Sequence, residues 1–365
     1  MRRCTALIIA ILLLGACSQD RVPVTLHPAD GVPERLYDWN LLYADGKRLG
    51  LNSDVIPYEL NTPLFSDYAL KLRTVWVPDG QSATYREDRE FDFPVGTILS
   101  KTFHYRYGDS GLQKLDAEAA LEPDGTLDLD KHRIVETRLL VHYEEGWRAF
   151  PYVWNEEQTE AFLEVAGADF EFQFGAETFP YLVPDTNQCS GCHTPDHSTK
   201  EIRPLGLKAH QLNRDFSYPD GTRNQLVQWS ESGLLSGTGS NPPRVARWSQ
   251  RESEPLDELA RAYLDANCAH CHNPSGAADT SALNLDLDAP VDRKFGICKP
   301  PVAVGRGSGN RPYDIYPGRP EGSILLYRME HDDPAIMMPE LGRATAHAEG
   351  VALIRDWITS LPGEC

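Results

Sequence analysis

Two Cys-x-x-Cys-His motifs, at residues 189–193 and 268–272, constrain this chain more than any other feature. In such a motif the two thiols can form thioethers with one haem, while the adjacent imidazole ligates the iron. Zinc binding and thiol–disulfide exchange are the alternatives, since CxxC pairs serve both. Neither alternative needs a trailing histidine twice, so the motifs predict two covalently bound haem c groups. The predicted attachment residues are Cys189, Cys192, Cys268 and Cys271, with His193 and His272 as iron ligands.

The N-terminal residues indicate export. Arg2 and Arg3 precede an apolar run over residues 6–14, which is typical of a secretory signal and too short to span a bilayer as a mature helix. Residues 14–17, Leu-Gly-Ala-Cys, resemble a bacterial lipobox. We therefore expect a signal peptide over 1–16 and acyl chains on Cys17, with an uncleaved anchor as the alternative. Ser18 follows, and a non-acidic residue there favours the outer membrane, so we expect a periplasm-facing lipoprotein of the bacterial cell envelope.

The charge is strongly acidic, with 54 Asp and Glu against 35 Lys and Arg and a formal net charge of −19. Loss of Arg2 and Arg3 with the signal would make it −21. Such a surface does not attract nucleic acid or anionic lipid. It favours a basic redox partner protein, although a surface that is acidic merely for solubility explains the composition equally well.

The eight cysteines divide cleanly. Cys4 would leave with the signal, Cys17 is the lipid site and four belong to the CxxCH motifs. The two that remain, Cys298 and Cys365, would lie in an oxidising compartment, where a disulfide is favoured over free thiols. We therefore predict a Cys298–Cys365 bond that holds the C-terminus on its own domain.

Hydrophobic patterning divides the chain into three parts. Short alternating stretches between about 70 and 161, separated by Gly, Pro and Asp, predict a β-sandwich or barrel, with the Lys, Arg and Thr positions on a solvated face. Amphipathic helices are predicted over 256–264 and 351–361. The expected fold is thus α+β and multidomain: a β-rich domain over 17–185, a haem-binding segment with linker over 186–244, and an all-α class I cytochrome c domain over 245–365.

The second motif fits the class I cytochrome c pattern, in which a methionine before the last helix completes the iron's coordination. Met338 stands immediately before Pro339 and ahead of the predicted final helix, so it is the expected ligand, with Met337 as the fallback. Histidine–methionine ligation suits electron transfer because neither ligand leaves the iron.

The iron of the first haem has no obvious sixth ligand, since no methionine lies between Cys192 and Met329. His197 is too close in sequence to His193 to reach the opposite face of a haem. His210 is the best local candidate. A histidine of the β-rich domain, His104 or His142, is possible, and so is an open position.

Several longer stretches carry a resemblance to a known family, namely residues 93–97, 136–141, 152–155, 212–215, 224–226, 314–318, 323–325 and 338–343. In these stretches the chain resembles a family of largely uncharacterised exported bacterial two-haem c-type cytochromes. The resemblance runs from about residue 55 to the end. It implies that the chain binds haem and takes part in redox reactions, but it implies no particular substrate. In addition, residues 93–97 leading to Lys101, the strand beginning Gly146-Trp147 and the CxxCH that follows look like the hydroxylamine-oxidising β-sheet cytochromes and cytochrome c′-β, which hold a five-coordinate haem.

Two functions follow from these expectations. The first is electron transfer in the bacterial cell envelope by a two-haem c-type cytochrome. The alternative is a haem-dependent oxidoreductase or gas-binding protein, which would act on a small molecule at an open first haem and receive electrons from the second. Whether the chain is an enzyme therefore depends on the first haem's sixth ligand.

Overall fold

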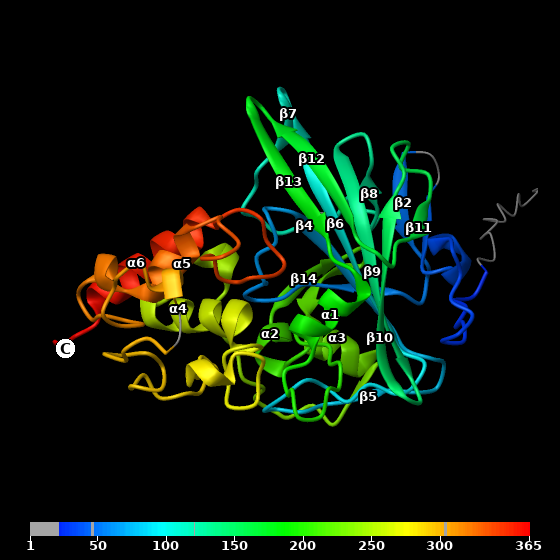
Figure 1. Ribbon diagram of the computed structural model, residues 1–365. Helices are drawn as coiled ribbons and strands as arrows, with labels where there is room; N and C mark the ends of the chain where they lie inside the picture. The colour runs from blue at the N-terminus through cyan, green and yellow to red at the C-terminus, as the bar shows by residue number, and fades with distance from the viewer. Residues whose placement is uncertain (1–21, 45–46, 120, 303–304) are drawn as a thin grey trace, which may run out of the picture.

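The computed structural model describes residues 22–44, 47–119, 121–302 and 305–365 (Figure 1). Its largest element is an antiparallel sheet with the strand order β11-β10-β9-β6-β4-β3, with β7 paired to β6. The strands of this sheet are β3 (Ile56–Tyr58), β4 (Leu70–Trp76), β6 (Ile98–Gly108), β7 (Gly111–Gln113), β9 (His132–Tyr143), β10 (Gly146–Trp154) and β11 (Ala161–Leu163). The β-rich N-terminal half predicted from the alternating pattern is therefore present.

Both faces of this sheet are packed. Successive side chains of a strand point to opposite faces, and Ile98 of β6 joins an apolar cluster with Leu139 and Trp39, whereas its neighbour Leu99 joins another with Leu140. The first cluster is covered by the N-terminal segment and the second by α2 (Ala209–Leu212) and α3 (Gln225–Glu231). The hairpin of β12 (Ala168–Phe174) and β13 (Glu177–Val183) contributes a third cluster around Phe103.

This double coverage corrects one expectation. Lys71 and Arg73, placed on a solvated face by their alternation with apolar residues, are 8% and 4% exposed, and every residue of β4 is buried. The alternation was read correctly as a strand, but the second face of the sheet is covered by later parts of the chain. Arg73 is stabilised there by Glu59, whose two carboxylate oxygens each lie 3.0 Å from its guanidinium.

Shorter elements surround the large sheet. Strand β1 (Leu42–Ala44) pairs with β2 (Arg48–Leu51), which pairs with β8 (Leu127–Asp128); β14 (Asp215–Tyr218) pairs with β15 (Gly221–Asn224); and β16 (Leu235–Ser236) runs parallel to β5 (Ala83–Thr84). The remaining helices are α1 (Thr186–His193), α4 (Leu256–Leu264), α5 (Ile324–Glu330) and α6 (Ala348–Ser360).

The expected all-α class I cytochrome c domain over 245–365 is wrong. The part of the chain that the structure describes is β-rich, with 27% strand, 21% helix and only about six helices. In 245–365 only α4, α5 and α6 are α-helices among the described residues, and long stretches between them are turns and loops. The amphipathic pattern identified α4 and α6, whose Tyr263 and Ile354 share one apolar cluster. It overlooked how many Gly, Pro and Asp residues separate them, which favour turns over helix. The boundaries at 185 and 244 stay a prediction.

The predicted disulfide is present. Cys298 and Cys365 are bonded, so the chain end beyond α6 is held to the loop around residue 298. In Figure 1 this segment, coloured orange to red, lies to the left of the sheet and ends at the label C.

The sheet also buries a histidine pair that makes stability depend on pH. The Nδ1 atoms of His104 and His132 lie 3.0 Å apart, and burial holds the pKa of His104 well below its usual value and lowers that of His132 to about 4. Between that value and the ordinary pKa of about 6.5, the unfolded chain binds more protons than the folded protein. We expect the free energy of unfolding to fall as the pH is lowered through this window.

Urea unfolding at pH 7 and pH 5 measures this loss. The variant His132→Gln should show a smaller loss than the unmutated protein, whereas replacement of the exposed His197 by Gln should leave it unchanged. An equal loss in all three proteins would show that the pair is not responsible.

Candidate haem-attachment site

The first CxxCH motif forms the last five residues of α1. The helix begins with a capping box, in which the Asp185 carboxylate accepts from the Gln188 backbone N–H at 2.7 Å and the Gln188 side chain accepts from the Asp185 N–H at 3.0 Å. This cap fixes the helix start just before Cys189. Cys189 is buried, and Cys192 and His193 are half-buried.

The imidazole of His193 is held in place by a backbone carbonyl. Its Nδ1 lies 2.7 Å from the backbone carbonyl oxygen of Arg203. A carbonyl only accepts, so Nδ1 carries the proton and Nε2 has a free lone pair. Burial lowers the pKa of His193 to about 4, so the ring is neutral at pH 7. A ligating histidine commonly donates its other ring N–H to a carbonyl in this way.

The second motif begins in a π-helical turn, Asp265–Ala269, which continues directly from α4. The turn is fixed by Asn267, whose amide donates to the Tyr263 carbonyl at 2.9 Å and accepts from the Phe65 backbone N–H at 2.8 Å. Such π-helical turns occur frequently at functional sites. Here the hydrogen bond from Phe65 connects the start of the CxxCH motif to the loop that precedes β4.

His272 is oriented like His193, through a hydroxyl instead of a carbonyl. Its Nδ1 lies 3.1 Å from Ser281 Oγ, and that hydroxyl donates to the Ala278 carbonyl at 2.7 Å. Because the serine proton is used there, His272 Nδ1 donates and its Nε2 is free. Burial lowers the pKa of this imidazole to about 4 as well. Both motifs thus present a neutral histidine with an available Nε2.

The four thiols are not arranged for disulfide exchange or for a shared zinc site. None forms a disulfide, and burial raises the pKa of each, to about 12 for Cys268 and about 11 for Cys271. Reactive cysteines have a lowered pKa instead. Among the described residues, the only group of three or more close metal-ligating side chains lies elsewhere, at Asp116, His347 and Glu349.

The two motifs lie against each other. The Cys271 thiol is 3.8 Å from the Gly191 carbonyl oxygen, and two further hydrogen bonds join the segments that follow the motifs. In these, the His197 N–H donates to the Ser275 carbonyl at 2.8 Å and the Asn273 amide donates to the Pro195 carbonyl at 3.2 Å. His270, inside the second motif, is half-buried and acts electrostatically on His193. Sequence reasoning treated each motif separately, and their contact became visible only in the structure.

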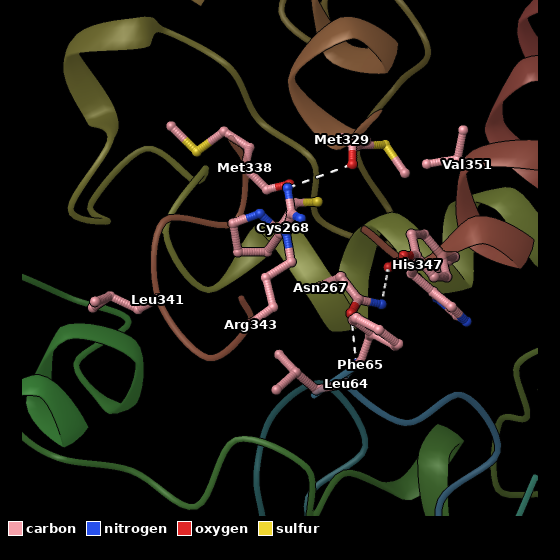
Figure 2. A pocket seen from close by; sticks show the side chains of 12 residues that line it. Leu64, Phe65, Asn267, Cys268, Met329, Met338, Leu341, Arg343, His347 and Val351 are labelled. Carbon is pink, nitrogen blue, oxygen red and sulfur yellow. Dashed lines mark hydrogen bonds between the residues drawn. The ribbon is translucent and has the colours of Figure 1, made fainter. Parts of the chain in front are cut away.

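Met338 lies at a small pocket beside the second motif (Figure 2). Cys268, Met329 and Met338 all line it, whereas Met337 is 5% exposed and absent from the lining. The loop that carries Met338 is held by Arg343, which donates to four backbone carbonyls. These belong to Arg328, Met329, His331 and Met338. The structure therefore brings Met338 and Cys268 to one pocket, and ligation itself stays a prediction.

The candidate ligands of the first haem lie in different places. The His210 Nε2 is buried without a hydrogen-bond partner, 3.8 Å from Asp265 Oδ2, and so faces the turn that leads into the second motif. His104 is paired with His132, His142 stacks on Trp147 and His197 is exposed. The assignment of His210 stays a prediction.

A row of cations beside the first motif was missed by sequence reasoning. Arg73, Lys101 and Arg138 are register neighbours on β4, β6 and β9, between the two apolar clusters of that sheet face. Lys101 has no carboxylate partner within hydrogen-bond or salt-bridge distance among the described residues, and burial lowers its pKa to about 7. Lys101 and Arg138 act electrostatically on Cys192 and His193. The only sequence signal was the alternation of basic with apolar residues, which indicated solvent exposure.

The predicted signal peptide over 1–16 and the predicted lipid site at Cys17 lie outside the described residues. Within the described residues, no helix has the length and apolar character needed to cross a bilayer. Neither a family model, nor a curated protein, nor a solved structure matches the chain.

Proposed function

We propose that this protein is a two-haem c-type cytochrome that transfers electrons in the bacterial cell envelope, to which Cys17 anchors it as a lipoprotein. The observation that carries the proposal is that the two CxxCH histidines have the same tautomer and the same charge state. His193 and His272 are each neutral, each donate from Nδ1 and each keep Nε2 free. The acceptor is a backbone carbonyl in one motif and a serine hydroxyl in the other, yet both fix the proton on Nδ1.

When bound, a haem supplies an iron that changes reversibly between two oxidation states by one electron. The chain's own residues would attach and orient the two groups. Cys189 and Cys192 would hold one and Cys268 and Cys271 the other, while Arg203 and Ser281 fix the rings of the two histidines. The contact between Gly191 and Cys271 supports exchange of electrons between the two sites. The acidic surface supports a basic protein partner.

The resemblance to the exported two-haem cytochromes supports the same proposal. The alternative, an oxidoreductase or gas-binding protein with an open first haem, is favoured by one observation. Lys101 acts electrostatically on His193 and, when protonated, would attract a small anion there, whereas Arg138 is paired with Glu136. The two functions differ in the sixth ligand of the first iron.

Haem content is the decisive test. The full chain should be produced in a bacterium that attaches haem c, and a pyridine haemochrome assay should give two haems per chain. Cys192→Ser and Cys271→Ser should each reduce that number, whereas Ser190→Ala, a change inside the first motif that keeps both thiols, should not. A protein that matures without haem, or with zinc at these cysteines, would overturn the proposal.

Carbon monoxide separates the two functions. If His210 fills the sixth position of the first iron, the reduced protein should bind little CO, and His210→Ala should open the site. Stoichiometric binding that His210→Ala leaves unchanged would favour the enzyme or gas-binding function.

For the second iron we expect Met338 to be the distal ligand. Met338→Ala should abolish the weak far-red sulfur-to-iron band of the ferric protein and lower the potential of that haem, because a thioether stabilises the ferrous state. The neighbouring Met337 is the matched control, since its side chain is buried away from the pocket lining. A band that survives Met338→Ala and disappears in Met337→Ala would assign the ligand to Met337 instead.

A further inference from the structure

Three side chains from two distant segments of the chain converge at a second site. Asp116 belongs to the loop between β7 and β8, His347 is the N-cap residue of α6 and Glu349 lies in the first turn of that helix. The His347 Nε2 lies 3.4 Å from Asp116 Oδ1 and 3.6 Å from Glu349 Oε2. One donor atom from each of the three residues lies within 4.8 Å of the others.

His347 is buried, yet this nitrogen has no hydrogen-bond partner. The residue is 6% exposed, and its Nε2 is a buried atom without a hydrogen-bond partner. Asp116 Oδ2 is also buried, and it forms an ion pair with Arg251 at 3.2 Å. Distances of 3.4 and 3.6 Å are too long for a strong N–H···O bond, which is about 2.9 Å. A buried polar atom without a partner is unfavourable, so something besides these two carboxylates is expected to satisfy it.

The distances suit a shared metal ion instead. When a tetrahedral ion binds nitrogen and oxygen at about 2.1 Å, two of its ligand atoms lie about 3.4 Å apart. The separations from His347 to Asp116 and to Glu349 are close to this value. The two carboxylates also attract a divalent cation, although Asp116 shares its charge with Arg251.

Each of the three donors is supported by a second residue. The Trp248 indole N–H donates to Asp116 Oδ1 at 2.7 Å, and the Tyr68 hydroxyl donates to Glu349 Oε2 at 2.9 Å. The Tyr263 hydroxyl lies 3.1 Å from His347 Nδ1. Such outer hydrogen bonds orient the ligands of metal sites. Phe65 stacks on the His347 ring at 4.2 Å, and these two side chains are seen together in Figure 2.

We propose that Asp116, His347 and Glu349 bind one divalent transition-metal ion of the zinc type, with a water molecule as the fourth ligand. Imidazole disfavours Ca²⁺ and Mg²⁺, which prefer oxygen ligands. The Glu349 side chain is 37% exposed, so the water reaches the ion from that side. The ion joins the loop after β7 to the start of α6 and thereby stabilises the contact between the two halves of the chain. The site uses none of the CxxCH residues.

Zn²⁺ is the probe for this site. The full-length protein, freed of metals by dialysis against a chelator, should bind one equivalent of Zn²⁺ in calorimetry that Glu349→Gln and Asp116→Asn each weaken at least tenfold. Asp356→Asn, an exposed acidic position on the same helix, is the matched control and should leave the affinity unchanged. Zn²⁺ that binds to the thiols contributes equally in all variants, so the difference in affinity between variants reports only on the proposed site.

Two results would overturn the proposal. In the rival arrangement a protonated His347 forms ion pairs with Asp116 and Glu349, while Arg251, 3.2 Å from Asp116 Oδ2, completes the charge balance. Zn²⁺ binding would then be the same in all four proteins. A crystal grown with Zn²⁺ and measured at the zinc edge should show an anomalous peak between the three side chains, and no peak there would exclude the site. Glu349→Gln keeps the test valid if Asp116→Asn does not fold, because Glu349 lies nearest the solvent.

Discussion

Glu136→Gln should lower the free energy of unfolding by about 3 kcal/mol, because it removes the charge partner of a largely buried arginine. Glu136 is fully buried, and its carboxylate accepts two bonds from Arg138, at 2.8 and 2.6 Å, and one from the Tyr181 hydroxyl at 2.6 Å. The expected loss is at the low end for a buried pair because the Arg138 side chain is 25% exposed. Urea unfolding of the two proteins at pH 7 measures the difference.

The matched control is Glu177→Gln. Glu177 pairs with Lys114 at 2.8 Å, but its side chain is 63% exposed, so the change should alter stability by less than about 1 kcal/mol. The double variant Glu136→Gln, Arg138→Met tests the mechanism further. It should be more stable than Glu136→Gln alone, since the unpaired charge of Arg138 is removed as well. Equal losses in Glu136→Gln and Glu177→Gln would mean that burial of the carboxylate has no special effect.

Local patterns predicted the parts of the fold that local forces decide. The amphipathic period identified α4 and α6, and the alternating stretches identified β4, β6 and β9. The disulfide could be inferred because only Cys298 and Cys365 had no other role. The CxxCH spacing selected His193 and His272, although nothing in it indicated which groups, Arg203 and Ser281, would fix their rings.

The features that the sequence did not predict correctly depend on contacts between residues far apart in the chain. Whether Lys71 is exposed is decided by what covers the other face of β4, and that covering comes from much later in the chain. The grouping of Asp116 with His347 has the same origin, since no short motif joins residues that lie so far apart in sequence. The class I cytochrome c expectation failed because two correctly identified helices were taken to imply a complete helical domain.

Removal of the Cys298–Cys365 disulfide should have the largest effect on stability that we expect from the described residues. The bond closes a loop between positions 67 apart in sequence. Restricting a loop of this length in the unfolded chain contributes about 4 kcal/mol on the chain-entropy account. The double variant Cys298→Ser, Cys365→Ser should lose about that amount in urea unfolding compared with the unmutated protein.

A local role for the bond would give a different pattern. The C-terminal residues after α6 are largely exposed, and α6 itself is anchored by Trp357, which is fully buried and donates to Asp257 of α4 at 2.8 Å. The folded packing should therefore survive removal of the bond, so the loss should come from the greater freedom of the unfolded chain. Reduction of the unmutated protein with dithiothreitol should reproduce the stability of the double variant and leave that variant unchanged. A loss well below 1 kcal/mol, or a large change in the near-ultraviolet circular dichroism of the folded protein, would contradict this account.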